Sequence, residues 1–238
     1  MGWSISGLSS IHRCPQTPEQ DGATRGVSYS STDRLCLDGQ RLVSVGGVYG
    51  SQNAEYRTEI DSYARIKQLG GTLTTPNTYF TVEQKDGRTL TYGSTATSRV
   101  TPAGVTVPLS WLVDKIEDRV GNYQSYSYTD FGNGEVLLGT VTYTGSLSGS
   151  AGDRSVTFSY QTRDDAVQDE DLPGREHASD IASSALAGGL TMQTQAVASI
   201  TTKVGTTTVR KYTPTYAKAQ YSGRLLMTAL QECAGESS

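Results

Sequence analysis

Apolar and polar residues alternate along much of this chain with a period of two, which is typical of half-buried β-strands. The alternation is clearest in residues 155–160, where Val156, Phe158 and Tyr160 are separated by serine and threonine. Glycine, asparagine and aspartate interrupt it every 10 to 20 residues or so and are typical turn formers. The pattern predicts an all-β fold, with an extended antiparallel sheet built from hairpins.

The most complete hairpin follows a first turn made by Asp118, Gly121 and Asn122. Glycine takes positive φ without strain, and short Asn and Asp side chains bond to nearby backbone. Tyr126 and Tyr128 are then expected on one face of a strand, with serine and threonine on the other. These residues predict a turn leading into a strand with an aromatic face.

The hairpin continues through a second turn, which contains Asp130 and Gly132. The strand that follows includes residues 140–144, where valine and tyrosine alternate with threonine. Residues 118–145 therefore predict turn, strand, turn and strand in succession.

Further strands are expected wherever the alternation recurs. Residues 55–69 fit both strand and helix spacing, so their periodicity is ambiguous. Hairpins are predicted at residues 34–45 and 78–92, and single strands at 3–11, 111–116, 155–160, 197–203, 206–216 and 225–230.

One region departs from this pattern, because it begins with an acidic run and continues with small residues. We expect an irregular insertion there, with one helical turn at 180–186. The predicted organisation is a β-segment at 1–163, the insertion at 164–189, a continuation of the β-segment at 190–233 and a disordered tail at 234–238.

Composition supports a sheet-and-turn protein, with 26 Gly and 14 Tyr but only 3 Phe and 2 Trp. The net charge of −4 and the scattered basic residues give no basic patch for nucleic acid or an anionic membrane. No stretch approaches the roughly 20 apolar residues of a membrane-spanning helix. The amino end lacks a basic leader followed by a long apolar run, so a signal peptide is not expected there.

Three cysteines, Cys14, Cys36 and Cys233, lack the close paired spacing of a zinc cluster. We expect free buried thiols; the alternative is a Cys14–Cys36 disulfide, which a secreted protein would permit.

The sequence gives little support to its candidate catalytic or metal-binding groups. The acidic run at 164–171 lacks the oxygen spacing of a calcium loop and is expected to be a solvated loop. His12 and His177 have no nearby Cys or acidic partner at ligand spacing. Ser148 lies in a Gly/Ser stretch that only superficially matches a nucleophile elbow. We therefore expect no catalytic residue, cofactor or metal, and no enzymatic activity in this chain.

Tyrosine-rich strand faces allow two interpretations. Aromatic rings stack on sugars, so a secreted carbohydrate-binding or adhesive β-domain is one hypothesis. Packing within the sheet, with hydroxyl groups reaching water, is the interpretation that we favour.

Five blocks carry a resemblance to a known family: residues 2–15, 33–43, 55–66, 86–93 and 118–129. In this order they resemble the shell-forming part of bacterial RHS/YD-repeat toxins, notably the Salmonella plasmid virulence protein B family and the B subunits of insecticidal toxin complexes. The resemblance favours strands over a helix for the ambiguous segment. The positions that match a YD-type unit are Asp118, Gly121, Asn122, Tyr126, Tyr128, Asp130 and Gly132.

The resemblance implies a structural role. In this family strands wind into a hollow β-shell that encloses a toxic carboxy-terminal polypeptide until delivery. The chain would then be one section of an RHS-type β-shell, with the rest of the shell and the enclosed toxin as partners. It would be cytoplasmic before release and extracellular afterwards.

This sequence lacks the upstream strands, the long repeat array, the propeller segments and the carboxy-terminal core of the family. It also lacks the Glu-x-Glu pair of the ADP-ribosyltransferase domain that some members carry. We therefore expect any toxic activity to lie in a payload outside this chain.

Overall fold

The computed structural model describes residues 7–163, 181–219 and 224–235. These residues form β-strands, one short helix α1 (Pro18–Asp21) and a single turn of 3-10 helix, η1 (Ala96–Ser98). Neither helix is long and apolar enough to cross a membrane. Every strand pairing is antiparallel, so the all-β fold and the antiparallel sheet are confirmed. The strands of the first half are β1 Ser10–Cys14, β2 Arg34–Leu37, β3 Gln40–Gly46, β4 Glu55–Thr58, β5 Arg65–Leu69, β6 Tyr79–Glu83, β7 Thr89–Tyr92, β8 Arg99–Val100 and β9 Ser110–Glu117.

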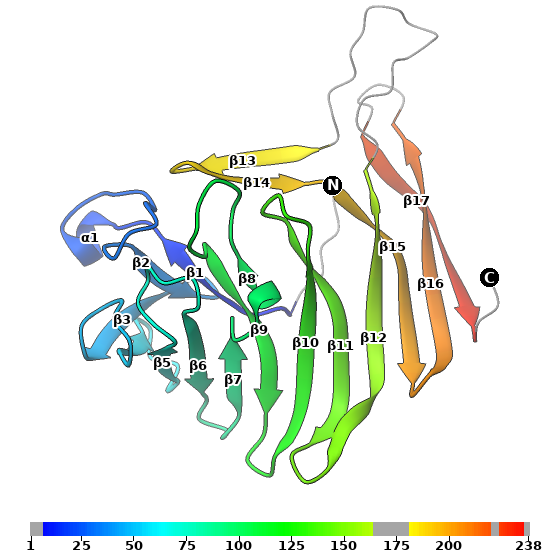
Figure 1. The fold of residues 1–238 in the computed structure, drawn as a ribbon, viewed down its shortest axis with the longest axis horizontal. Coiled ribbons are helices and arrows are strands. Elements are labelled where there is room, and N and C mark those ends of the chain that lie inside the picture. The colour runs from blue at the N-terminus through cyan, green and yellow to red at the C-terminus, as the bar shows by residue number, and fades with distance from the viewer. Residues whose placement is uncertain (1–6, 164–180, 220–223, 236–238) are drawn as a thin grey trace, which may run out of the picture.

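The first half closes into a small barrel, which the sequence did not predict. Pairing runs in order from β1 to β7 and then to β9, and β9 pairs back with β1. Ile11 of β1 lies between Leu37 of β2 and Trp111 of β9, and this closes the ring. Figure 1 shows the barrel at one side of the molecule, in blue to green.

The core of the protein fills this barrel. Trp111 is fully buried, stands edge-on to Phe80 with ring centroids 5.0 Å apart, and donates its indole N–H to the Thr78 carbonyl at 2.7 Å. Gly93, at φ +70°, packs so closely on Trp111 that a Cβ there would overlap the indole ring. The other buried apolar side chains of the cluster are Ile11, Leu35, Leu42, Ala54, Tyr56, Ala64, Ile66, Leu73, Val82, Leu90, Tyr92 and Val113.

The second half is an extended curved sheet that continues from β9. Its order is β9-β10-β11-β12-β15-β16-β17, and Figure 1 shows its long strands side by side. Few of its side chains are fully buried, because the sheet has no second layer among the described residues. The remaining strands are β10 Asn122–Asp130, β11 Val136–Ser146, β12 Ser150–Thr162, β13 Ala182–Leu186, β14 Gly189–Gln193, β15 Gln195–Val204, β16 Thr207–Lys218 and β17 Leu225–Ala234.

A separate hairpin, β13–β14, crosses the ends of neighbouring strands, and we call residues 182–193 the strap (Figure 1). Its tip is tied to the barrel region by two backbone hydrogen bonds between Leu190 and Ala103, of 2.8 and 2.9 Å. Gly189 packs against Tyr29 and Pro102, where a Cβ would overlap both side chains. The strap therefore joins the first half of the fold to the second.

Most of the expected hairpins are present. The hairpins at 34–45, 78–92 and 118–145 correspond to β2–β3, β6–β7 and β10–β11. The ambiguous segment at 55–69 forms strands β4 and β5, as the resemblance indicated.

The helical turn expected at 180–186 is wrong, because Ala182–Leu186 is strand β13, whose cross-strand partner β14 overrides local helix propensity. The first strand begins at Ser10, and its expected start at Trp3 lies outside the described residues.

The prediction of free thiols at Cys14 and Cys36 is also wrong, because the two form a disulfide. The pairing of β1 with β2 places Cys36 opposite His12, so Cys14 is its diagonal neighbour, with the two Cα atoms 5.9 Å apart. Sequence spacing alone does not reveal this proximity. Cys233, on β17, is free.

Candidate functional site

The turn at the start of β10 is built around the carboxylate of Asp118. It accepts hydrogen bonds from the backbone N–H groups of Val120 and Asn122, each at 2.9 Å, and from the Asn122 side chain at 2.8 Å. Hydrogen bonding from the Asn122 side chain contributes most to lowering the pKa of Asp118. Gly121 supplies the positive φ of +86°. These residues form an exposed turn, and the Asp118 carboxylate is used for hydrogen bonds within that turn.

The two tyrosines of β10 differ in burial. Tyr128 is 7% exposed and donates its hydroxyl to the Val113 carbonyl at 2.6 Å, and burial raises its pKa. Tyr126 is half-buried, packs against the core and donates to the Gln124 side chain at 3.0 Å. Tyr128 thus fastens β10 to the barrel strand β9.

The second turn of this hairpin is held by Asp130, whose carboxylate accepts the Gly132 N–H at 2.9 Å. The turn leads through Asn133 and Gly134 to the buried Glu135. The YD-type positions therefore form one hairpin, and they lie at its turns and on its barrel-facing side rather than converging on a ligand site.

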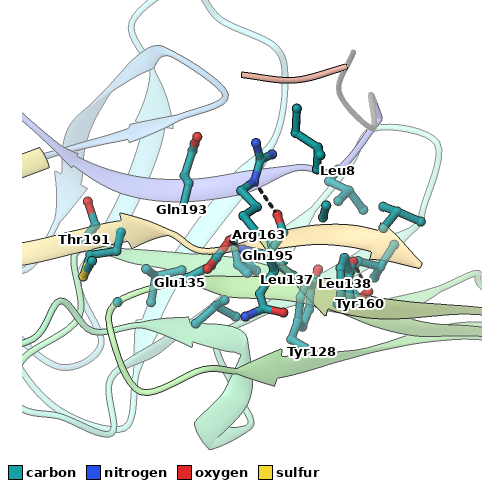
Figure 2. A pocket seen from close by; sticks show the side chains of 18 of the residues that line it. Leu8, Tyr128, Glu135, Leu137, Leu138, Tyr160, Arg163, Thr191, Gln193 and Gln195 are labelled. Atoms are coloured by element: carbon teal, nitrogen blue, oxygen red, sulfur yellow. Dashed lines mark hydrogen bonds between the residues drawn. The ribbon is translucent and has the colours of Figure 1, made fainter. Parts of the chain in front are cut away.

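A cavity of about 640 Å³ lies on the same side of the sheet, between the strap and β11, β12, β15, β16 and β17. Figure 2 shows its wall, with Tyr128, Leu138 and Tyr160 on the sheet and Thr191 and Gln193 on the strap. Much of the lining is apolar, contributed by Leu8, Val100, Leu112, Val136, Leu137, Leu138, Met192, Ala196, Val197, Leu225, Leu226 and Met227.

Glu135 is the acidic residue among those that line this pocket, and it is buried, at 6% exposure. One of its oxygens accepts the Thr194 N–H and hydroxyl, both at 2.7 Å, and the other accepts the Gln195 N–H at 3.3 Å. Thr194 lies directly between the strap and β15, so Glu135 fixes the base of the strap to the β10–β11 turn. Its preceding Gly134 touches the strap so closely that a Cβ would overlap the Leu190 carbonyl.

The hydroxyl and guanidinium groups of the pocket also bond within the fold. Tyr160 donates to the Leu138 carbonyl at 2.6 Å, and burial raises its pKa to about 12. Tyr216 donates to the Val197 carbonyl at 2.8 Å, and Arg163 donates to the Gln195 carbonyl at 2.9 Å (Figure 2). The pocket is therefore suited to binding an apolar group. Its tyrosine hydroxyls are occupied by backbone acceptors.

A family model described as Salmonella virulence plasmid 65kDa B protein, SpvB, matches residues 27–141. This segment of the chain is similar to the SpvB family. The matched segment runs from the loop before β2, through the rest of the barrel, into β11. No curated protein sequence matches the chain significantly.

Solved structures share the fold of this chain. The N-terminal domain of effector protein SpvB from Salmonella typhimurium strain LT2 aligns with a TM-score of 0.67 and 16% identity, over 95% of this chain and 87% of that domain. A TcdB2-TccC3 structure aligns with a TM-score of 0.65 and 16% identity, over 94% of this chain and 14% of that chain. The Photorhabdus luminescens Tc holotoxin pore gives 0.63 and 14%, over 94% of this chain and 13% of that chain.

The chain thus spans most of the SpvB N-terminal domain and a small part of the toxin-complex chains that it matches. Because the sequence identities are this low, the structural matches establish the fold of the chain and nothing more.

Of the candidate chemical groups, the structure describes His12 and Ser148, which lie on different elements. His12 is on β1, where burial lowers its pKa against the opposing effect of Asp38. Ser148 lies in the exposed β11–β12 turn and shares a hydrogen bond with Ser146 at 2.8 Å. His177 and the acidic run at 164–171 lie outside the described residues. Within the described ranges no three His, Cys, Asp or Glu side chains form a metal-binding group.

The sequence did not point to the pocket, because its walls come from strands distant along the chain. Glu135 follows the Asn133-Gly134 turn and has no flanking motif that would distinguish it from a surface acid. Its burial is determined by the strap, whose position depends on tertiary contacts.

Replacing Tyr128 with phenylalanine should lower the free energy of unfolding by about 1 to 2 kcal/mol, because the buried Val113 carbonyl loses its side-chain donor. The matched change Tyr126→Phe removes an exposed bond to a side chain and should have an effect of less than about 0.5 kcal/mol. Urea denaturation of both variants measures the difference. Equal effects would contradict the fastening role of Tyr128.

Proposed function

We propose that this chain is a non-catalytic wall segment of a bacterial toxin protein of the RHS or toxin-complex type, and that the wall encloses a toxin polypeptide. The observation that carries this proposal is the sheet itself, which continues from the barrel to β17 in hairpin order. Alternating strand residues let such a sheet act as a barrier with two different faces. Any toxic activity then belongs to a payload outside this chain.

The last strand supports a role within a larger wall. Among the described strands, β17 pairs only with β16, so its other edge presents unpaired backbone N–H and C=O groups. Leu226, Met227 and Leu230 on this strand are 49%, 41% and 57% exposed. Isolated soluble proteins seldom leave such an edge uncovered, and the next part of the shell would cover it.

Secretion is part of the proposal. The Cys14–Cys36 disulfide favours an oxidising compartment, since disulfides persist outside the cell and are rare in the bacterial cytoplasm. The chain would be made in the cytoplasm and act after release, with the remainder of the shell and the enclosed polypeptide as its partners.

An open wall edge should make the isolated 238-residue chain associate with itself. The weight-average mass from sedimentation equilibrium is expected to rise with protein concentration, because two β17 edges can pair. Leu230→Lys should suppress the rise, since a charge on an edge strand opposes pairing. Val120→Lys, at an 80% exposed turn residue away from β17, is the matched control and should leave association unchanged.

A chain that remains monomeric over the whole concentration range and melts sharply would count against the wall-segment proposal. Equal suppression by both lysine variants would show that the association does not use the β17 edge.

A further inference from the structure

The pocket beside the strap presents apolar surface, and its buried polar side chains are already engaged. Glu135 bonds to residues 194 and 195, and Tyr160 and Tyr216 donate to backbone carbonyls. A charged or strongly polar occupant would have to break these bonds or leave its own polar groups unsatisfied. The volume of about 640 Å³ falls within the range of ligand sites, so the chemistry of the pocket selects a large apolar group.

Leu8 contributes to the wall of this pocket and lies at the beginning of the described chain. Figure 2 shows Leu8 beside the cavity, with Leu138 and Tyr160 on the sheet below it. Residues 1–6 lie outside the described residues, but they are covalently attached to this wall. Trp3 is five positions before Leu8. An extended chain spans at most about 3.6 Å per residue, so the two Cα atoms are at most roughly 18 Å apart. The pocket is therefore within reach of this segment.

The sequence of the segment matches what the pocket can accept. Met1, Trp3 and Ile5 alternate with glycine and serine, so an extended backbone places the three apolar side chains on one face. The segment carries no charged side chain, so burying that face leaves no ionised side chain without a partner. Gly7 joins it to Leu8 at φ +87°, a conformation that other residues rarely adopt, so the chain can change direction next to the pocket.

We infer that the amino-terminal segment 1–6 folds back into this pocket, with Trp3 and Ile5 against its apolar wall. The inference goes beyond the proposed function and does not depend on it, because both partners belong to this chain. Attachment at the pocket wall gives the segment an effective concentration in the millimolar range, so it occupies the pocket ahead of free apolar molecules. Leu226 and Met227 of the lining are 49% and 41% exposed, and the docked segment covers apolar surface of this kind.

The test uses the full 238-residue chain and its own tryptophans, Trp3 and Trp111, of which Trp111 is fully buried. The fluorescence lost in Trp3→Phe isolates the signal of Trp3. Quenching of this signal by acrylamide, a neutral molecule, should be weak, because the pocket shields the indole ring. Met227→Asp should raise the quenching constant several-fold, since it places a charge in the pocket lining. Val209→Asp, at a residue of similar exposure on β16 outside the pocket, should leave it unchanged.

The alternation within the segment provides a second test that leaves the pocket itself unchanged. Ile5→Asp puts a charge on the docking face and should expose Trp3 to acrylamide, as Met227→Asp does. Ser4→Asp, one position away on the opposite face, is the matched control and should leave Trp3 protected. If Met227→Asp fails to fold by circular dichroism, this pair of variants carries the test.

A pocket without its segment should accept a free apolar dye. Combining Trp3→Ser with Ile5→Ser should lower the Kd of Nile red by roughly tenfold or more, because the tethered competitor is removed. Adding Met227→Asp to this double variant should weaken the binding of the dye again, which shows that the dye occupies the same pocket.

Quenching of Trp3 in the wild-type chain as strong as that of free tryptophan would overturn the inference. Protection that persists in both Met227→Asp and Ile5→Asp would also overturn it, since the segment would then dock elsewhere. Protection that disappears on dilution would place the segment in the pocket of a second copy, against the inference. Equal binding of Nile red to the wild-type chain and the double serine variant would show that the pocket is open, with the same consequence.

Discussion

Replacing Arg13 with methionine is expected to lower the free energy of unfolding by about 4 kcal/mol, a loss typical of a buried ion pair that is broken from one side. Arg13 and Asp33 are almost completely buried, and their side chains lie 2.8 Å apart. Removing the arginine would leave the Asp33 carboxylate buried with only the Ser28 N–H and hydroxyl as donors.

Arg13 also holds three loops against the barrel wall. Its guanidinium donates to the carbonyls of Pro108, at 2.8 Å, of Ser30, at 3.1 Å, and of Leu73. Methionine fills much of the same volume but makes none of these hydrogen bonds. The three carbonyls would become acceptors without that donor, which adds to the loss of stability.

Urea denaturation of Arg13→Met, Asp33→Asn and the double variant measures the coupling between the two side chains. The double variant should be less destabilised than the sum of the single variants, because no charge is then left unpaired. Arg65→Met is the control, since Arg65 is 44% exposed and solvent screens its contact with Glu55, so the loss of stability there should be small. A loss at Arg13 no larger than that at Arg65 would contradict the structural role of the buried pair.

Removing the disulfide by changing Cys14 and Cys36 together to serine is expected to lower the free energy of unfolding by about 3 kcal/mol. The bridge closes a loop between residues 22 positions apart and so restricts the unfolded chain. It also ties β1 to β2, and β1 is the strand whose pairing with β9 closes the barrel. Arg41 additionally donates a hydrogen bond to the Cys14 sulfur at 3.2 Å.

Thermal and urea denaturation with and without a phosphine reductant provide the measurement. The reductant should destabilise the wild-type chain and leave the double serine variant unchanged. Cys233→Ser should be neutral, because this thiol is free and lies on β17. A reductant effect that persists in the double variant would show that another process is responsible.

The sequence predicted the strands well where one face of the sheet is buried, because that burial imposes a period of two. The β6–β7 and β10–β11 hairpins follow from alternation and turn residues such as Gly87 and Gly132, which both adopt positive φ. Closure of the barrel depends on the pairing of Ile11 with Trp111, a contact across a hundred positions that no local pattern encodes.

The candidate site was harder to predict for the same reason. Tyr128 was expected on a packed strand face, and the structure buries it. Its acceptor, the Val113 carbonyl, could not be read from side-chain patterns. Glu135 resembles a surface residue until the strap places Thr194 and Gln195 around it. Local sequence patterns do not predict the contacts of side chains whose partners are backbone groups on distant strands.

Closure of the barrel between β1 and β9 has a consequence for the order in which the chain folds. All strands of the barrel are complete by Glu117, so this part can fold during synthesis, before the later strands emerge. Each later strand of the extended sheet can then pair with the strand before it, which has already formed. Because each pairing closes only a short loop, its entropy cost is small. The strap docks late in this order of folding steps, because its Leu190 must return to Ala103. The barrel would thus serve as the nucleus from which the wall grows outward, one strand at a time.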